Sequence, residues 1–225
     1  MIGAIVVAAG AGRRFGGAVP KAFLPFQGRP LFAHSLPAFR ALRSLGDLVL
    51  VVPRGRVQWV IRRVGAALLQ GGVTKVVAGG RRRQDSVRRG LEAMNRRCDV
   101  VLVHDAARPF VTASLARAVA ALARREGGAV PLLAVRETLK RVVGDLVVET
   151  LDRSGVAVAQ TPQGARTALL RQAYAEGHGD ADATDDVQLL ERLGARVAGV
   201  VGDPLNVKIT SRADLPLAEY IVTLR

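Results

Sequence analysis

The chain has little of several residue types that define other classes of protein. It contains one cysteine, Cys98, and three scattered histidines in 225 residues, so it cannot form an internal disulfide and has no spacing typical of a zinc site. Nine aromatic residues offer few surfaces for stacking bases. No apolar stretch reaches the ~20 residues of a membrane span, and no signal-peptide pattern precedes the first apolar segment. We therefore expect a cytoplasmic protein that does not contact a membrane.

Lysine is also scarce, although the chain is strongly basic. Four of the 33 basic residues are lysines, and the net charge is +14. The arginines are spread through every segment, which indicates a compositional bias and disfavours nucleic acid as the main partner. A basic RNA-binding module on an α/β scaffold stays as a distant alternative. Lys21 and Lys208 fall in the motifs described below, whereas Lys75 and Lys140 stand in ordinary positions.

Apolar segments alternate with amphipathic ones along the chain, which is typical of a parallel α/β sheet. The length favours a single domain over residues 1–225 with a Rossmann-like, mostly parallel sheet and flanking helices. Strands are predicted over 2–8, 47–53, 73–78, 99–104, 129–133 and 196–201. Helices are predicted over 30–43 with a kink at Pro37, 56–70, 84–96, 112–126, 164–176 and 184–193, and from about 212 after a capping box of Ser211 and Asp214. Residues 135–160 break this rhythm, because Val142–Val148 reads as a hairpin around Gly144-Asp145, and we expect a protruding β-arm there.

The first apolar segment ends in a glycine-rich, basic turn. Its sequence is Ala8-Ala9-Gly10-Ala11-Gly12-Arg13-Arg14, and Pro20-Lys21 follow. Small residues leave backbone amides uncovered and the basic residues add positive charge, which favours a nucleoside triphosphate. A dinucleotide fingerprint is disfavoured because the next glycine, Gly16, comes one residue too late, and a Walker loop is disfavoured because no Gly-Lys-Ser or Gly-Lys-Thr occurs. Taken alone, the turn is equally compatible with a solvated surface loop.

Two further polar turns follow the third and fourth predicted strands. The first contains Gly79-Gly80, Arg83 and Ser86, and the second is Val103-His104-Asp105-Ala106-Ala107-Arg108-Pro109. Ligands of parallel sheets bind at the carboxyl ends of the strands, so these turns should meet the first one. Asp105 can hold Mg²⁺ against phosphates or cap a turn, and Ser86 can be a helix N-cap. His104 is expected to be a packed or hydrogen-bonded histidine.

Together these segments resemble the 2-C-methyl-D-erythritol 4-phosphate cytidylyltransferase family of non-mevalonate isoprenoid biosynthesis. The resemblance runs nearly end to end, and its later parts are Thr138 with Lys140, Asp152-Arg153, Thr161-Pro162-Gln163, Thr184-Asp185-Asp186 and Asn206-Val207-Lys208-Ile209-Thr210. It implies transfer of CMP from CTP to 2-C-methyl-D-erythritol 4-phosphate, with release of pyrophosphate. A cytidylyltransferase for another polyol phosphate, such as ribitol 5-phosphate, is the nearest alternative.

The resemblance also implies roles for individual residues. Three basic residues are expected to be catalytic: Arg14, Lys21 and Lys208. The residues expected at CTP are Ala8, Ala9, Gly10, Ala11, Gly12, Gly80, Ser86, Asp105 and Ala107, with Asp105 also at Mg²⁺ or another divalent cation. The residues expected at the second substrate are Arg108, Thr138, Arg153, Thr161 and Thr184, although each threonine alone is ordinary strand or turn usage.

The family's arm reaches across a two-fold axis, so the resemblance implies a homodimer in which Arg153 is a candidate for serving the partner's site. Two positions depart from the family pattern. Ala22 replaces a glutamine after Pro-Lys, and Arg81 replaces a polar or acidic residue after the double glycine. The contacts that those two side chains make in the family are therefore not expected here, whereas contacts of the main chain are.

Overall fold

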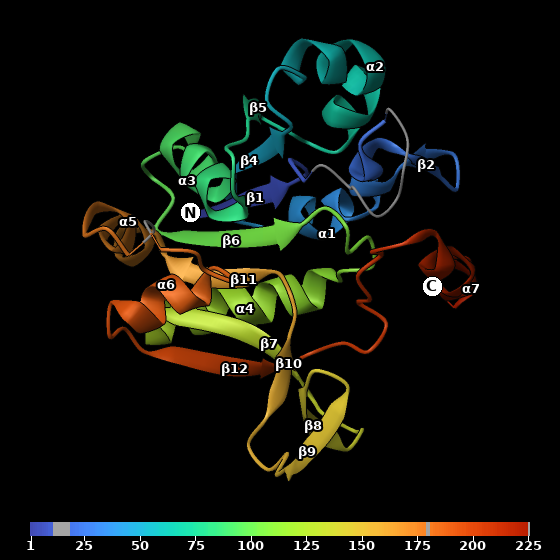
Figure 1. Cartoon of the computed structure of the whole chain (residues 1–225). Helices are drawn as coiled ribbons and strands as arrows, with labels where there is room; N and C mark the ends of the chain where they lie inside the picture. Colours follow the sequence, from blue (N-terminus) through green and yellow to red (C-terminus); the bar gives the residue numbers. More distant parts are fainter. Residues whose placement is uncertain (11–18, 179–180, 225) are drawn as a thin grey trace.

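The fold is built around an eight-stranded sheet in which most strands run parallel. The structure, a computed structural model, describes residues 1–10, 19–178 and 181–224 (Figure 1). The strand order is β10-β7-β11-β6-β1-β4-β5, with β12 also paired to β7, and β10 and β11 run antiparallel to their neighbours. The strands are β1 (Ile2–Val7), β4 (Leu45–Val52), β5 (Lys75–Ala78), β6 (Val100–Asp105), β7 (Gly128–Ala134), β10 (Ala157–Ala159), β11 (Gln163–Arg166) and β12 (Val197–Val201). The predicted mostly parallel α/β fold is confirmed.

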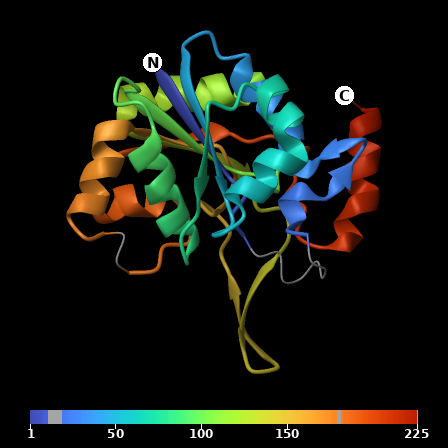
Figure 2. The same ribbon diagram turned by 90° about the horizontal axis from the view of Figure 1, so that it is seen from above.

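Helices cover both faces of this sheet (Figure 2). The central strands are apolar on both sides, as buried parallel strands are: in β1, Ala4 and Val6 belong to one core cluster and Ile5 to the other. The first cluster includes residues of α1 (Leu36–Arg40), α2 (Val57–Gln70) and α4 (Ala113–Glu126), and the second includes residues of α3 (Arg83–Ala93), α5 (Thr167–Ala175) and α6 (Val187–Arg192). The carboxyl ends of β1, β5 and β6 face the cavity that is described below.

The C-terminal helix α7 (Leu215–Thr223) packs beside a small hairpin of β2 (Pro25–Phe26) and β3 (Arg29–Pro30). Ile209 and Ile221 join Phe26 in this third apolar cluster. The predicted capping box of Ser211 and Asp214 is present, at the 3-10 turn that precedes α7. This packing fixes the segment that carries Lys208.

The predicted arm is a two-stranded hairpin that extends away from the sheet (Figure 1). Strands β8 (Leu139–Val143) and β9 (Leu146–Leu151) pair antiparallel, and Gly144 between them has a φ of 58°. Five apolar side chains are more than half exposed on it: Val142, Val143, Leu146, Val147 and Val148. An isolated hairpin is marginal in water, so these side chains mark a candidate intermolecular contact.

The helix predicted over 30–43 is wrong. The structure has a 3-10 turn at Leu31–His34 and then the short α1. Pro37 lies in the first turn of α1, where a missing amide costs no helical hydrogen bond, so it starts a helix instead of kinking a longer one.

The helix predicted over 164–176 starts too early, because residues Gln163–Arg166 form β11 between β6 and β7. A Cβ on Gly164 would lie 2.9 Å from side-chain atoms of both Val119 and Ala123. Glycine therefore allows this strand to lie directly against α4. The short strands β2, β3 and β10 were not predicted, and the described helices include none long and apolar enough to cross a membrane.

Candidate active site

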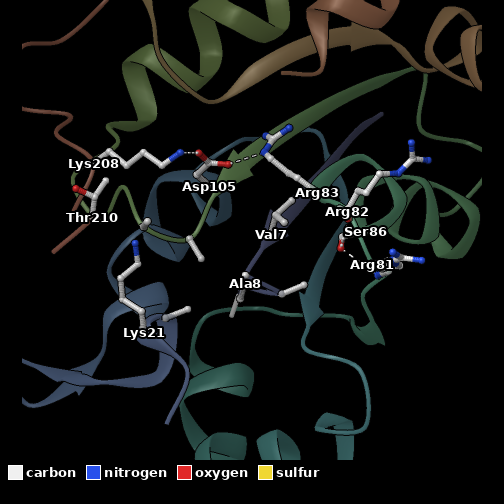
Figure 3. Close-up of a pocket in the computed structure, with 16 residues that line it drawn as sticks. Val7, Ala8, Lys21, Arg81, Arg82, Arg83, Ser86, Asp105, Lys208 and Thr210 are labelled. Atoms are coloured by element: carbon white, nitrogen blue, oxygen red, sulfur yellow. Dashed lines mark hydrogen bonds and ion pairs between the residues drawn. The ribbon is translucent and has the colours of Figure 1, made fainter. Parts of the chain in front are cut away.

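A cavity of about 480 Å³ opens where β1, β5 and β6 end at the same edge of the sheet (Figure 3). Its lining comes from the turns after these strands and from two other segments: Val7, Ala8, Ala9, Gly10, Gly80, Arg81, Arg82, Arg83, Ser86, Asp105, Ala106, Ala107, Lys21, Ala22, Lys208 and Thr210. Ligands of parallel α/β sheets bind at this edge, and the volume is within the usual range of small-molecule sites.

Glycines and a serine form the wall between β1 and β5. A Cβ on Gly79 would lie 2.4 Å from the Cβ of Ala9, so the glycine lets the two turns approach each other. The Ser86 hydroxyl accepts a hydrogen bond from the Gly80 amide at 3.0 Å and donates to the Arg82 carbonyl at 3.1 Å. Because Ser86 lies inside α3, its alternative role as an N-cap is wrong.

Asp105 carries the negative charge of the cavity. One carboxylate oxygen accepts a hydrogen bond from Arg83 Nε at 3.0 Å, and the other pairs with Lys208 Nζ at 2.6 Å (Figure 3). Burial alone would raise the pKa of the Asp105 carboxyl, but the charges of Arg83 and Lys208 hold it well below its usual range. Asp105 is therefore an ionised, ion-paired carboxylate rather than a turn cap.

Arg83 connects Asp105 to a second aspartate behind the cavity. Its Nη2 donates to Asp186 Oδ2 at 2.7 Å. Burial works against the charge of Arg83, but the two aspartates raise the pKa of its guanidinium above the usual value. The Asp186 side chain is 5% exposed, and its burial raises the pKa of its carboxyl in spite of Arg83. The result is a chain of alternating charge that runs through Lys208, Asp105, Arg83 and Asp186.

Two lysines reach the cavity from distant parts of the sequence. Lys21 begins a 3-10 turn, and its ammonium donates to the Ile209 carbonyl. Lys208 is the neighbour of Ile209, whose amide donates to the Ala107 carbonyl at 2.8 Å and so ties this segment to the turn after β6. Both ammonium groups consequently lie on the same side of the cavity (Figure 3).

A buried polar layer supports Asp105 from behind. The Thr161 hydroxyl accepts a hydrogen bond from the Asp105 amide at 3.1 Å and lies 3.1 Å from His104 Nδ1. His104 Nε2 is 2.9 Å from the Arg108 carbonyl, and burial lowers the pKa of His104 to about 4. The prediction of a packed, hydrogen-bonded histidine is confirmed.

The lining offers one carboxylate for a metal ion. The described residues contain no group of three or more His, Cys, Asp or Glu side chains that could hold a metal. Mg²⁺, however, is commonly held by one or two carboxylates while phosphate oxygens and waters complete its shell. The donor set therefore fits a magnesium ion that arrives with a triphosphate, and it does not fit a resident ion held by protein alone.

Most of the residues predicted to be catalytic or to bind CTP line this one cavity. Lys21, Lys208, Ala8, Ala9, Gly10, Gly80, Ser86, Asp105 and Ala107 all line the cavity. Ala11, Gly12 and Arg14 lie outside the described residues. Arg83 was noted in the sequence motif but not assigned to the site, because a run of three arginines does not reveal which one turns toward Asp105.

The residues predicted to bind the second substrate are spread over the turn after β6, the base of the arm, the link between β10 and β11, and the loop before α6. Thr161 is buried with its hydroxyl engaged, as described above. Arg108 donates to the Asn206 carbonyl at 2.8 Å, and its buried Nε has no hydrogen-bond partner among the described residues. Arg153 and Thr138 are exposed at the base of the arm, and Thr184 is exposed before α6.

Comparison with known proteins identifies the family. The family model described as 2-C-methyl-D-erythritol 4-phosphate cytidylyltransferase (IspD) matches residues 2–224. The chain belongs to this family. It is accordingly a cytidylyltransferase, and hence a nucleotidyltransferase, of isoprenoid biosynthesis.

Relatives and solved structures agree with this assignment to the cytidylyltransferases. The 2-C-methyl-D-erythritol 4-phosphate cytidylyltransferase of Carboxydothermus hydrogenoformans is 39% identical, over 99% of this chain and 95% of the relative. The crystal structure of the Thermus thermophilus enzyme of the same name has a TM-score of 0.80 at 37% identity and covers 97% of this chain and 98% of its own. The 4-diphosphocytidyl-2C-methyl-D-erythritol synthase structure from Anaerococcus prevotii has a TM-score of 0.84 at 25% identity and covers 99% and 96%.

Other relatives are longer than this cytidylyltransferase. The bifunctional enzyme IspD/IspF of Solidesulfovibrio magneticus is 44% identical over 94% of this chain, but the match covers 54% of the relative. The chain thus spans about half the length of the bifunctional relatives that it matches.

Proposed function

We propose that CTP occupies the cavity at the ends of β1, β5 and β6, where Lys21 and Lys208 neutralise its phosphates. The observation that carries this proposal is that two of the four lysines, from opposite ends of the sequence, line one cavity walled by small residues. Backbone groups of Ala8–Gly10 and Gly80, with Ser86, are available for the base and the ribose. Arg14, which lies outside the described residues, is proposed as a further triphosphate ligand by family resemblance.

In the proposed reaction a phosphate oxygen of 2-C-methyl-D-erythritol 4-phosphate attacks the α-phosphorus of CTP, and pyrophosphate leaves. The attacking phosphate is already anionic, so catalysis needs alignment and neutralisation of charge more than proton transfer. Lys208 Nζ pairs with Asp105 at 2.6 Å. Because Arg83 also pairs with Asp105, Lys208 can exchange that carboxylate for the α-phosphate without leaving Asp105 unpaired.

We further propose that Asp105 contacts a magnesium ion or another divalent cation that accompanies the triphosphate. When bound, such an ion neutralises negative charge on the phosphates and helps to orient them. The place of Asp105 supports this role, because its ionised carboxylate lines the cavity and its Oδ2 becomes available as an oxygen ligand when Lys208 turns to the α-phosphate.

We propose that the second substrate binds beside the α-phosphate, with a guanidinium at its phosphate and hydroxyls at its polyol. Arg108, Thr138, Arg153 and Thr184 are the candidates. Thr161 acts instead by holding the Asp105 amide. Since Arg153 lies at the base of an arm with exposed apolar side chains, a homodimer formed through the arm would bring residues of one subunit to the site of its partner.

A cytoplasmic location accords with the use of a nucleoside triphosphate. We also propose that nucleic acid is not a partner, because the basic residues are spread through every segment rather than gathered in one tract, and because the chain has few aromatic residues for stacking bases. A filter-binding titration checks this proposal: RNA retention that survives moderate salt, without turnover of CTP, would contradict it.

The decisive experiment for the substrate measures pyrophosphate release from CTP and Mg²⁺. Methylerythritol phosphate and ribitol 5-phosphate are supplied separately, and a reaction without any acceptor is the control. We expect release with methylerythritol phosphate. Preference for ribitol 5-phosphate would refute the acceptor while keeping the mechanism, and release with neither would refute the proposed reaction.

A further inference from the structure

The segment Thr161-Pro162-Gln163 positions both aspartates that contact Arg83. The Thr161 hydroxyl accepts a hydrogen bond from the Asp105 amide at 3.1 Å. Two residues later, Gln163 Oε1 accepts hydrogen bonds from the Asp186 amide at 2.8 Å and from the next amide at 3.2 Å. Thr161 and Gln163 are 5% and 2% exposed, so both contacts belong to the buried interior. One short segment therefore sets the spacing between two carboxylates that are distant in the sequence.

Arg83 spans that spacing with two different nitrogens of its guanidinium. Nε donates to Asp105 at 3.0 Å and Nη2 donates to Asp186 at 2.7 Å. A planar guanidinium held at two points has little freedom to rotate. Its side chain is 28% exposed and lines the cavity, so the group is fixed beside the position that a nucleotide would occupy.

Asp186 does not line the cavity, and burying its charge carries a desolvation cost. Its Oδ1 is buried without a hydrogen-bond partner among the described residues, while its Oδ2 faces Arg83. A buried ion pair is weak support for stability, because the desolvation of both charges offsets their attraction. A role in orienting Arg83 accounts for this arrangement better than a contribution to stability does.

We infer that Asp186 is a positioning residue, which holds Arg83 against Asp105 and so fixes the carboxylate that faces the nucleotide cavity. This inference rests on the proposed function of the cavity. Without the Asp186 carboxylate, Arg83 has one anchor and the Arg83–Asp105 pair loses its fixed geometry. One negative charge is also removed from the neighbourhood of the triphosphate. A misaligned Asp105 carboxylate lowers kcat, whereas loss of the Asp186 charge does not weaken the binding of an anionic nucleotide.

The test compares Asp186→Asn with Asp185→Asn in the full-length protein. Asparagine has nearly the shape of aspartate and keeps an oxygen for Arg83 Nη2. Asp185 is the matched control, because it carries the same charge one residue earlier and, in the described part of the chain, forms no ion pair with Arg83. It accepts hydrogen bonds from the Gln163 side chain and the Gln188 amide, and asparagine keeps an oxygen for Gln163, so that the contact between Gln163 and the Asp186 amide is retained. We expect Asp186→Asn to lower kcat about tenfold to a hundredfold, while its KM for CTP stays within about twofold or falls. Asp185→Asn should change kcat by less than about threefold.

A double-mutant cycle with Arg83→Lys separates positioning from simple damage to the fold. If Asp186 acts through Arg83, Asp186→Asn should lower kcat much less in the Arg83→Lys background than in the wild type. The inference is overturned by equal effects in both backgrounds, by a parallel rise in KM for CTP, by an unchanged kcat in Asp186→Asn, or by an equal loss in Asp185→Asn. Failure of the proposed function is distinguishable, because the wild type itself would then release no pyrophosphate.

Discussion

Lys208 and Lys75 form two ion pairs of nearly the same geometry, which allows the catalytic proposal to be tested against an internal control. Lys208 lies 2.6 Å from Asp105 with its side chain 43% exposed, and Lys75 lies 2.6 Å from Asp47 with its side chain 41% exposed. Both aspartates are largely buried. The pairs differ in place: Lys208 lines the cavity, and Lys75 lies at the start of β5, at the opposite end of that strand.

The two lysines should therefore contribute similarly to stability and differently to rate. Replacing either with glutamine removes a charged hydrogen bond from an aspartate that keeps other donors, Arg83 for Asp105 and the Asn95 amide for Asp47. Because each lysine is more than a third exposed, we expect each substitution to cost only about 1 kcal/mol of unfolding free energy. For a chain of this size that corresponds to a fall in Tm of about 2–4 °C.

The effect on turnover should separate them by orders of magnitude. A cation that stabilises developing charge at a transition state contributes about 3 kcal/mol, so Lys208→Gln should lower kcat by about two to three powers of ten. Lys75→Gln should leave kcat within about threefold of the wild type. Pyrophosphate release under saturating substrates gives kcat, and thermal denaturation gives Tm. A Lys208→Gln enzyme with nearly normal kcat, or a Lys75→Gln enzyme that is equally impaired, would refute the proposed role of Lys208.

Three further outcomes are expected. Lys21→Ala should lower kcat by about two to three powers of ten with an unchanged circular dichroism spectrum, and near-normal turnover would remove Lys21 from the mechanism. Arg153→Ala should mainly raise KM for the polyol phosphate. Mixing Arg153→Ala subunits with Lys21→Ala subunits should restore activity only if the arm completes the partner's site, because one site of each mixed dimer is then intact. Burial lowers the pKa of His104 to about 4, so the unfolded chain gains a proton before the folded one as the pH falls, and unfolding free energy should drop by about 2 kcal/mol between about pH 7 and about pH 5. Urea denaturation of His104→Gln should lack that part of the drop, and an identical pH dependence would assign it to other groups.

Much of the sheet was predictable because its signals are local. The β-branched run of β1 and the Ser211–Asp214 capping box act through neighbouring residues, and both lie where the sequence placed them. The strand β11 was missed for the opposite reason. Gln163-Gly164-Ala165-Arg166 has no alternating pattern, and it is a strand because it fits between β6 and β7 with Gly164 against α4. Only contacts between distant segments determine that choice.

The convergence of the residues expected at CTP was more predictable than the positions of those expected at the second substrate. The residues expected at CTP follow the ends of neighbouring strands, and the sheet topology alone brings such turns together. Thr138, Arg153 and Thr184 come from the arm and from a loop, whose positions relative to the cavity do not follow from strand order. Thr161 shows a further limit, since its spacing in the motif is the same whether its hydroxyl faces a substrate or, as here, the Asp105 amide.

The scarcity of lysine was a useful but incomplete signal. In a chain with 29 arginines, the four lysines are the positions that carry a compact ammonium group instead of a planar guanidinium. Two of them line the cavity, yet Lys75 forms an ion pair as close as that of Lys208. Residue type and pairing therefore do not distinguish a structural lysine from a catalytic candidate. What distinguishes them is the place of the pair. Lys208 and Asp105 line the cavity at the carboxyl ends of β1, β5 and β6, whereas Lys75 lies at the start of β5. In the proposed mechanism, the Lys208 ammonium can exchange its carboxylate for a phosphate at that cavity.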